Sequence, residues 1–73
     1  MDSVYIRFKI VKEKRSIEVK FDSRLSFTEN FRLLNYQNLD KLRVYDPNRK
    51  IFLDRNVPIG EMHISGFMTF YLY

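Results

Sequence analysis

The residues that could carry out catalysis are few and scattered in this chain of 73 residues. His63 is the single histidine, and the chain has no cysteine, so it offers neither a zinc site built on thiolates nor a cysteine nucleophile. Asp46, Asp54 and Glu61 lie in segments typical of turns and loops, where acidic side chains usually accept hydrogen bonds from backbone N–H groups. Because no nucleophile stands beside a base, we expect no enzymatic activity and neither a metal nor another cofactor.

The two glycines, Gly60 and Gly66, stand apart from each other and cannot form a glycine-rich loop that binds phosphate. Gly66 directly precedes a segment in which apolar residues alternate with others. We expect this glycine to adopt a positive φ at the start of a strand.

Residue types that favour binding are better represented than residue types that favour catalysis. Tyrosine and arginine are enriched at the energetic centres of interfaces, because each buries a large area yet keeps a polar end. The net charge of +4 favours an acidic partner, whether protein, nucleic acid or membrane surface. Such a charge is also common for solubility alone. Whether these side chains act together depends on the elements that carry them.

Three segments alternate between apolar and other residues and predict half-buried strands: 4–10, 17–21 and 68–73. The charged residues 12–15 would connect the first two strands as a hairpin. Residues 42–45 and 51–53 predict two shorter strands around the turn signal Asp46-Pro47-Asn48-Arg49, in which proline fixes φ at the second position. Residues 58–62 predict a single helical turn before the last strand.

One helix is predicted between the second and third strands. Ser26 and Glu29 have the spacing of a capping box, in which each side chain accepts a hydrogen bond from the other residue's backbone N–H. Three apolar residues then recur at helical spacing and predict one buried stripe: Phe27, Phe31 and Leu34. Asn35 and Asn38 would end the helix after about three turns, because asparagine tolerates the left-handed conformation.

These elements predict one α+β domain over residues 1–73, with the helix packed on one face of a mixed sheet. The N-terminus lacks the basic and apolar segments of a signal peptide, and no apolar run is long enough to cross a bilayer. The absence of cysteine suits a reducing compartment. We therefore expect a cytoplasmic protein that does not insert into a membrane.

The element order resembles the β-grasp fold, and in particular its ubiquitin-like branch. The most specific stretch is residues 51–66, where a short strand ending at Asp54 precedes a helical turn at Pro58, then Ile64 and Gly66. The resemblance implies a ubiquitin-like β-grasp with a mixed five-stranded sheet and one helix on one face. In that arrangement the first strand lies between the second and the last, and the third lies beside the last.

Conjugated ubiquitin-like proteins and sulfur carriers end in a Gly-Gly tail, whereas this sequence ends at Tyr73 within the last predicted strand. We therefore expect neither conjugation nor sulfur transfer unless a longer precursor exists. Among relatives without the tail, the chain resembles the YukD/EsaB family, which likewise stops at the final strand, and residues 30–36 and 68–73 look more bacterial than eukaryotic. This resemblance implies an accessory of a bacterial type VII secretion system. The chain is also similar to Hub-type splicing modifiers in its length and its tyrosine-rich C-terminus. It departs from both families at Asn30, where an apolar residue is common.

The ubiquitin-like arrangement gathers side chains that point away from the helix on one face of the sheet, Glu18 and Thr69 among them. The residues predicted to bind a partner there are Tyr5, Arg7, Lys9, Lys20, Arg43, Tyr45, Tyr71 and Tyr73. In the resemblance, Arg43, Tyr71 and Tyr73 match positions of the patch by which ubiquitin is recognised. We predict that this face binds an acidic or amphipathic segment of a protein.

Other interpretations of the same face stay open at this point. Tyrosine favours strands by propensity, and lysine and arginine keep a surface soluble, so the pattern also arises without a partner. Aromatic and cationic side chains together can bind single-stranded nucleic acid, although four cations are a modest number. The second strand would have a free edge, which permits pairing with a partner strand or a homodimer.

Overall fold

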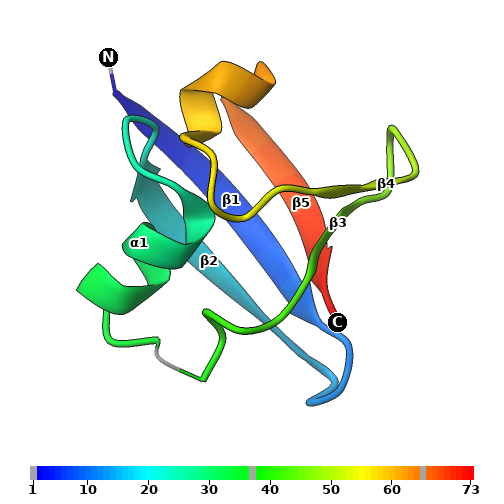
Figure 1. Ribbon diagram of the computed structural model, residues 1–73. Helices are drawn as coiled ribbons and strands as arrows, with labels where there is room; N and C mark the ends of the chain where they lie inside the picture. Colours follow the sequence, from blue (N-terminus) through cyan, green and yellow to red (C-terminus); the bar gives the residue numbers. More distant parts are fainter. Residues whose placement is uncertain (1, 37, 65) are drawn as a thin grey trace.

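The computed structural model describes residues 2–36, 38–64 and 66–73. Five strands form one sheet: β1 (Ser3–Ile10), β2 (Arg15–Asp22), β3 (Val44–Asp46), β4 (Ile51–Leu53) and β5 (Phe67–Leu72). Their order is β2-β1-β5-β3-β4, with β1 parallel to β5 and the other pairs antiparallel. The helix α1 (Phe27–Leu33) lies on one face of the sheet, and the 3-10 helix η1 (Ile59–Met62) precedes β5 (Figure 1). The predicted α+β architecture and strand order are confirmed.

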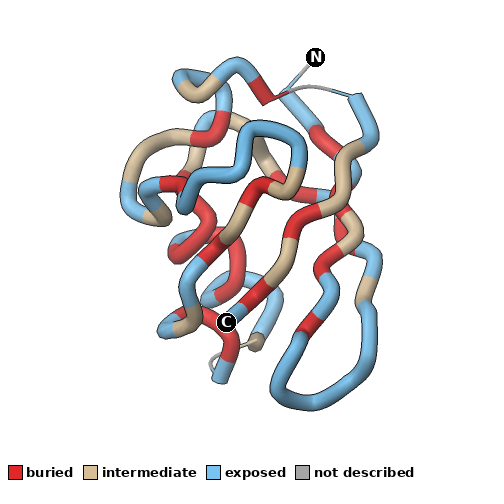
Figure 2. Tube along the Cα trace, turned by 90° about the vertical axis from the view of Figure 1, so that its right-hand side faces the viewer, coloured by how far each residue is buried: buried red, intermediate tan, exposed pale blue. Residues whose placement is uncertain are grey.

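Alternation along the strands divides the sheet into a covered face and an open face, as the bands of burial in Figure 2 show. Phe8 lies at the centre of the covered face, and four other phenylalanine rings surround it at centroid distances of 5.1 to 6.3 Å. These four, on β2, α1 and β5, are Phe21, Phe27, Phe31 and Phe70. Full burial of each ring contributes roughly 1.5–3 kcal/mol to folding. The core therefore lies between α1 and the sheet.

Helix α1 begins as predicted and ends earlier than predicted. Ser26 Oγ accepts a hydrogen bond from the Glu29 N–H at 3.1 Å, and Glu29 Oε1 accepts one from the Ser26 N–H at 3.1 Å, which confirms the capping box. The expectation of three turns is wrong, because α1 has seven residues, but Asn35 follows the helix in the predicted left-handed conformation with a φ of 62°. Leu34, predicted to be buried, is 45% exposed, and Leu39 from the following loop fills the core instead.

Asn30 occupies a helix position where an apolar residue is common, and it is buried there. Its side-chain oxygen accepts a hydrogen bond from the Asp22 N–H at 2.8 Å, and its Nδ2 donates to the Asp22 carbonyl at 2.9 Å. The same Nδ2 donates to the Ser26 carbonyl at 2.8 Å. The Asn30 amide thus forms hydrogen bonds with the backbone of Asp22, at the edge of the sheet, of the kind that a neighbouring strand would form.

The third strand differs from the prediction at both ends, whereas β4 spans the predicted residues 51–53. Strand β3 starts at Val44 rather than at residue 42, and Asp46 belongs to the strand and is fully buried. Its carboxylate accepts hydrogen bonds from the N–H groups of Asn48 and Arg49, as expected of a turn acid. The Arg49 guanidinium lies 3.5 Å from the same carboxylate and donates to the Met62 carbonyl at 3.1 Å. Arg49 therefore ties the β3–β4 turn to η1.

The segment around η1 behaves largely as the sequence predicts. Gly66 has a φ of 73°, which confirms its predicted conformation, and its carbonyl accepts the Tyr5 N–H at 3.0 Å. Asp54 caps the N–H of Asn56 at 2.9 Å, and His63 is an exposed residue at the end of η1. Across residues 2–36, 38–64 and 66–73, the His, Asp and Glu side chains form no group of three that could hold a metal ion. None of the helices in these ranges has the length and apolar character needed to cross a membrane.

Candidate interaction face

The eight predicted binding residues all project from the open face of the sheet, the side away from α1. On β1, β2, β3 and β5 they alternate with the buried residues of the core. Arg43 precedes β3, but its backbone exchanges two hydrogen bonds with Tyr73, at 2.8 and 3.0 Å. Directly opposed residues of an antiparallel pair point to the same side, so Arg43 belongs to this face as well.

Four aromatic rings gather at one end of the open face, and we name them the large cluster: Tyr45, Phe52, Tyr71 and Tyr73. Tyr45 stands between Phe52 of β4 and Tyr71 of β5 in the sheet register. Its ring centroid lies 5.1 Å from that of Phe52, 6.5 Å from that of Tyr71 and 6.1 Å from that of Tyr73. Such spacings are typical of attractive aromatic pairs, and the rings of Phe52 and Tyr73 meet Tyr45 edge to face, whereas that of Tyr71 is tilted by 37°.

Two cations lie against the large cluster. The Arg43 guanidinium stands over the Phe52 ring at 4.8 Å from its centroid, and Lys9 Nζ stands over the Tyr71 ring at 5.6 Å. Both distances fall within the range of cation–π attraction, about 6 Å. The cluster therefore presents an apolar surface with positive charge at its border.

A second group of residues, the small cluster, lies at the opposite end of the open face: Tyr5, Phe67, Arg7 and Lys20. Tyr5 lies beside Phe67 of β5 and opposite Lys20 of β2. The Arg7 guanidinium stands over the Phe67 ring at 5.6 Å. A shallow hollow of about 240 Å³ lies here and is lined by Tyr5, Ile6, Glu18, Val19, Lys20 and Phe67.

The charge of the open face is mainly positive. Two acids of β2 alternate onto this side, and each is paired with an arginine: Asp22 with Arg24, and Glu18 with Arg7. The Glu18 carboxylate binds the Arg7 guanidinium at 2.6 and 3.0 Å. Both side chains are about half exposed, so the pair contributes about 0–1 kcal/mol to stability. Within the described part of the chain, no acidic side chain forms an ion pair with Lys9, Lys20 or Arg43.

Phe52 and Phe67 complete the two clusters, and neither is among the residues that the sequence pattern predicted for this face. Their exposed fractions are 49% and 58%. Phe52 lies in a run of three apolar residues, where no alternation shows which side a residue faces. Phe67 continues the alternation of Thr69, Tyr71 and Tyr73 by one step. Extending the last strand to its first apolar residue would have found it.

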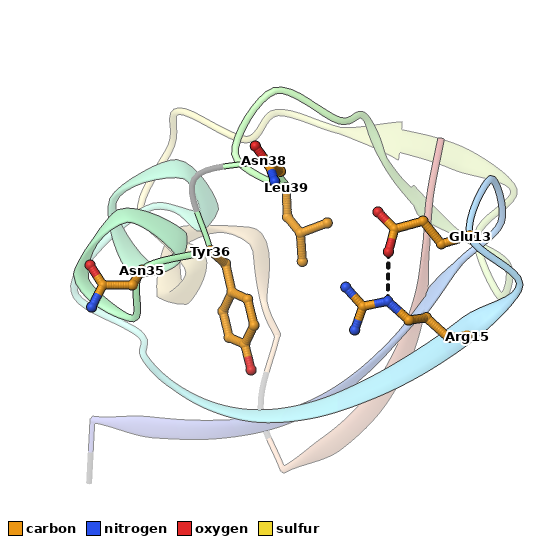
Figure 3. A pocket seen from close by; sticks show the side chains of 6 residues that line it. All are labelled: Glu13, Arg15, Asn35, Tyr36, Asn38 and Leu39. Carbon is orange, nitrogen blue, oxygen red and sulfur yellow. Dashed lines mark hydrogen bonds and ion pairs between the residues drawn. The ribbon is translucent and has the colours of Figure 1, made fainter.

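Another hollow, of about 310 Å³, lies between the β1–β2 hairpin and the loop after α1 (Figure 3). It is lined by Glu13, Arg15, Asn35, Tyr36, Asn38 and Leu39. The Arg15 guanidinium is paired with the Glu13 carboxylate at 2.5 Å, so its charge is already balanced. This hollow therefore lacks the uncompensated charge that marks the open face.

No protein-family model matches the chain, and no curated protein matches it. Solved structures do match. A protein designed on the basis of ubiquitin has a TM-score of 0.72 and 23% identity, over 99% of this chain and 88% of that chain. The crystal structure of the UBL domain of Plasmodium falciparum Dsk2 has a TM-score of 0.64 and 9% identity, over 97% of this chain and 99% of that chain.

These likenesses confirm the predicted fold class, a ubiquitin-like β-grasp with a five-stranded mixed sheet and one helix. At such identities they establish the fold alone. No sequence match supports the resemblance to the YukD/EsaB family.

Proposed function

We propose that this ubiquitin-like β-grasp domain is a non-enzymatic interaction module whose open face binds an acidic segment of a partner protein. The observation that carries the proposal is the large cluster, four adjacent aromatic rings on the solvent side with Arg43 and Lys9 over two of them. Aromatic residues and arginine are the types most enriched among residues that dominate binding energy.

The number of aromatic residues outside the core supports this proposal. The chain has five tyrosines and seven phenylalanines, and six of these twelve lie on the open face. A domain of this size needs most of its apolar side chains inside, because its core provides only about 3–5 kcal/mol of net stability. Contiguous exposed aromatic surface in a small protein is typical of an interaction site.

A pathway is also part of the proposal, and it rests on the YukD/EsaB resemblance in residues 30–36 and 68–73. We infer a cytoplasmic accessory role in a bacterial type VII secretion system. A neighbouring gene for a membrane ATPase, together with genes for small helical secreted proteins, would support this role. A gene neighbourhood of RNA-processing proteins in a eukaryote would favour the Hub-type alternative instead.

The test of the binding proposal is partner recovery with variants of the large cluster. We expect Arg43→Glu and Tyr71→Ala each to reduce recovery of the partner roughly 30-fold or more, which corresponds to about 2 kcal/mol at a residue that dominates an interface. Lys41→Glu and Leu33→Ala are matched controls, since both residues are exposed and lie outside the open face. Unchanged recovery with the first two variants would remove the open face as the binding site.

The same variants distinguish a protein partner from single-stranded nucleic acid. A nucleic acid would bind these side chains by base stacking and phosphate neutralisation, with an affinity that falls steeply as salt rises. We expect oligonucleotides to show no binding of this kind at low salt. If they bind and Arg43→Glu abolishes that binding, nucleic acid replaces protein as the partner.

A further inference from the structure

The two aromatic clusters of the open face lie a fixed distance apart. Tyr71 of the large cluster and Phe67 of the small cluster both belong to β5, four residues from each other. At about 3.3 Å per residue their positions are separated by about 13 Å along the strand. Between Tyr71 and Phe67 lies the row of Thr69, Arg7 and Glu18, which has no aromatic ring and from which the Arg7 side chain reaches over Phe67. A single partner segment would therefore meet two separate apolar contact points.

The backbone of the sheet indicates what kind of segment fits this face. Strands β1, β5 and β3 each lie between two other strands, so their N–H and C=O groups are directed to neighbours within the sheet. An extended peptide lying on the face would place its own N–H and C=O groups against aromatic rings without hydrogen-bond partners, which is costly. An α-helix satisfies its backbone groups internally, so only its side chains need to match the face.

The spacing of the clusters sets the pattern of that helix. Residues seven or eight positions apart lie on the same side of an α-helix and are separated by a rise of about 10–12 Å. That separation is close to the distance between the two clusters. One large apolar side chain would contact the rings of Tyr71 and Phe52, and a second, two turns away, would enter the hollow beside Phe67 and Tyr5.

The cations of the face determine the charge of the helix. Lys9 borders the large cluster on β1, Arg43 lies over Phe52, and Lys20 borders the hollow of the small cluster. An acidic helix would place carboxylates beside these cations on either side of its apolar stripe. A basic helix would face like charges at both ends.

We propose that the partner segment is an acidic amphipathic α-helix with two large apolar residues two turns apart, one for each cluster. This inference rests on the proposed function, and it adds the conformation, the charge and the spacing of the segment that binds.

Synthetic peptides test the inference on the intact chain. The first peptide is a glutamate-rich helix with leucines at positions i and i+7. The second has the same composition with leucines at i and i+9, which lie on opposite sides of the helix. The third carries the first pattern with a central proline that prevents helix formation. We expect the first to bind at least tenfold more tightly than the other two, and its helical circular dichroism to increase on binding.

Protein variants then test the use of both clusters. We expect Phe52→Ser and Phe67→Ser each to weaken binding of the first peptide about tenfold. Both side chains are about half exposed, so the variants should remain folded, which thermal unfolding would check. Lys41→Glu, outside the open face, should leave the dissociation constant unchanged.

Each contrary result has a separate meaning. If the second or third peptide binds as tightly as the first, the helix or its spacing is wrong. If Phe67→Ser has no effect while Phe52→Ser weakens binding, only the large cluster is used and the two-point inference fails, although the proposed function stands. If the natural partner is recovered equally with Arg43→Glu and Tyr71→Ala, the proposed function itself fails.

Discussion

The two faces of the sheet are both rich in aromatic residues, but the residue types differ. The covered face and α1 bury five phenylalanines and no tyrosine. The open face carries four of the five tyrosines and the other two phenylalanines, together with the cations Arg7, Lys9, Lys20 and Arg43. A phenol group needs water or a hydrogen-bond partner, whereas a phenyl ring does not. The covered face is therefore built for a dry core, and the open face for water or a partner.

The largest effect expected from this difference is on stability, and a matched pair of substitutions measures it. Phe8→Ala removes the ring at the centre of the core and should cost about 3–5 kcal/mol, close to the whole stability of a domain of this size. Tyr71→Ala removes a ring of the same size from the open face and should cost about 1 kcal/mol, because only aromatic pairing and partial burial are lost. Urea denaturation of both variants measures the two costs.

Comparable costs for the two substitutions would contradict the division between a stabilising face and a face proposed to bind a partner. The same measurement on Phe52→Ala provides a check, since Phe52 belongs to the large cluster at the edge strand. We expect its cost to resemble that of Tyr71→Ala rather than that of Phe8→Ala.

A smaller effect is expected at the boundary between α1 and β2, where two buried polar residues of one helix differ in their hydrogen bonds. Asn30 makes three hydrogen bonds through its amide, whereas Thr28 Oγ1 is buried and makes none. Asn30→Leu should therefore cost about 1–3 kcal/mol, because the backbone groups of Asp22 lose their partner. Thr28→Val should be nearly neutral or slightly stabilising.

Chemical denaturation of these two variants distinguishes hydrogen bonding from packing. If Asn30→Leu has the same free energy of unfolding as the original chain, the hydrogen bonds of the Asn30 amide add no stability beyond what a leucine provides by packing. A loss in Thr28→Val comparable to that in Asn30→Leu would indicate that any change at this helix is harmful.

Much of the division between the two faces could be predicted from the sequence, because alternation and capping are local signals. In β1 and β2, the alternation of apolar residues at every second position shows which face of the sheet each side chain points to. The capping box of Ser26 and Glu29 marks the start of α1. The end of α1 followed only in part: the left-handed Asn35 was predicted, but helical spacing alone does not reveal that Leu34 stays exposed and that Leu39 fills the core in its place.

The features that were missed depend on contacts between distant segments. Asp46 carries the residue type and position of an exposed turn acid, yet it is fully buried beside Arg49. Phe52 joins the large cluster only because β4 pairs with β3, a long-range contact that no window of sequence shows. Asn30 looked like a departure from an apolar pattern until the position of the Asp22 backbone explained it.

The smallest effect is expected at the end of β2, where Asp22, which alternates onto the open side of the strand, forms a pair with Arg24. The Arg24 guanidinium donates to the Asp22 carboxylate at 2.8 and 3.1 Å and lowers the pKa of Asp22 below its ordinary value of 3.8. The Arg24 backbone N–H, which donates at 2.9 Å, lowers this pKa further. Because the pKa is lower in the folded state, Asp22 contributes stability above pH 3.8, and this contribution is lost as the pH falls through the folded-state pKa.

An NMR titration of the Asp22 carboxyl group should therefore give a midpoint below 3.8, and Arg24→Gln should move it upward. The stability advantage of the original chain over Asp22→Asn should shrink as the pH falls below about 4, and added salt should reduce it, because the pair is at the surface. A midpoint at or above 3.8 would show that the pair does not form in solution. If the pair of Asp22 and Arg24 contributes little to the free energy of unfolding, the half-exposed pair of Arg7 and Glu18 should contribute equally little. The charges of the open face are then available to interact with a partner.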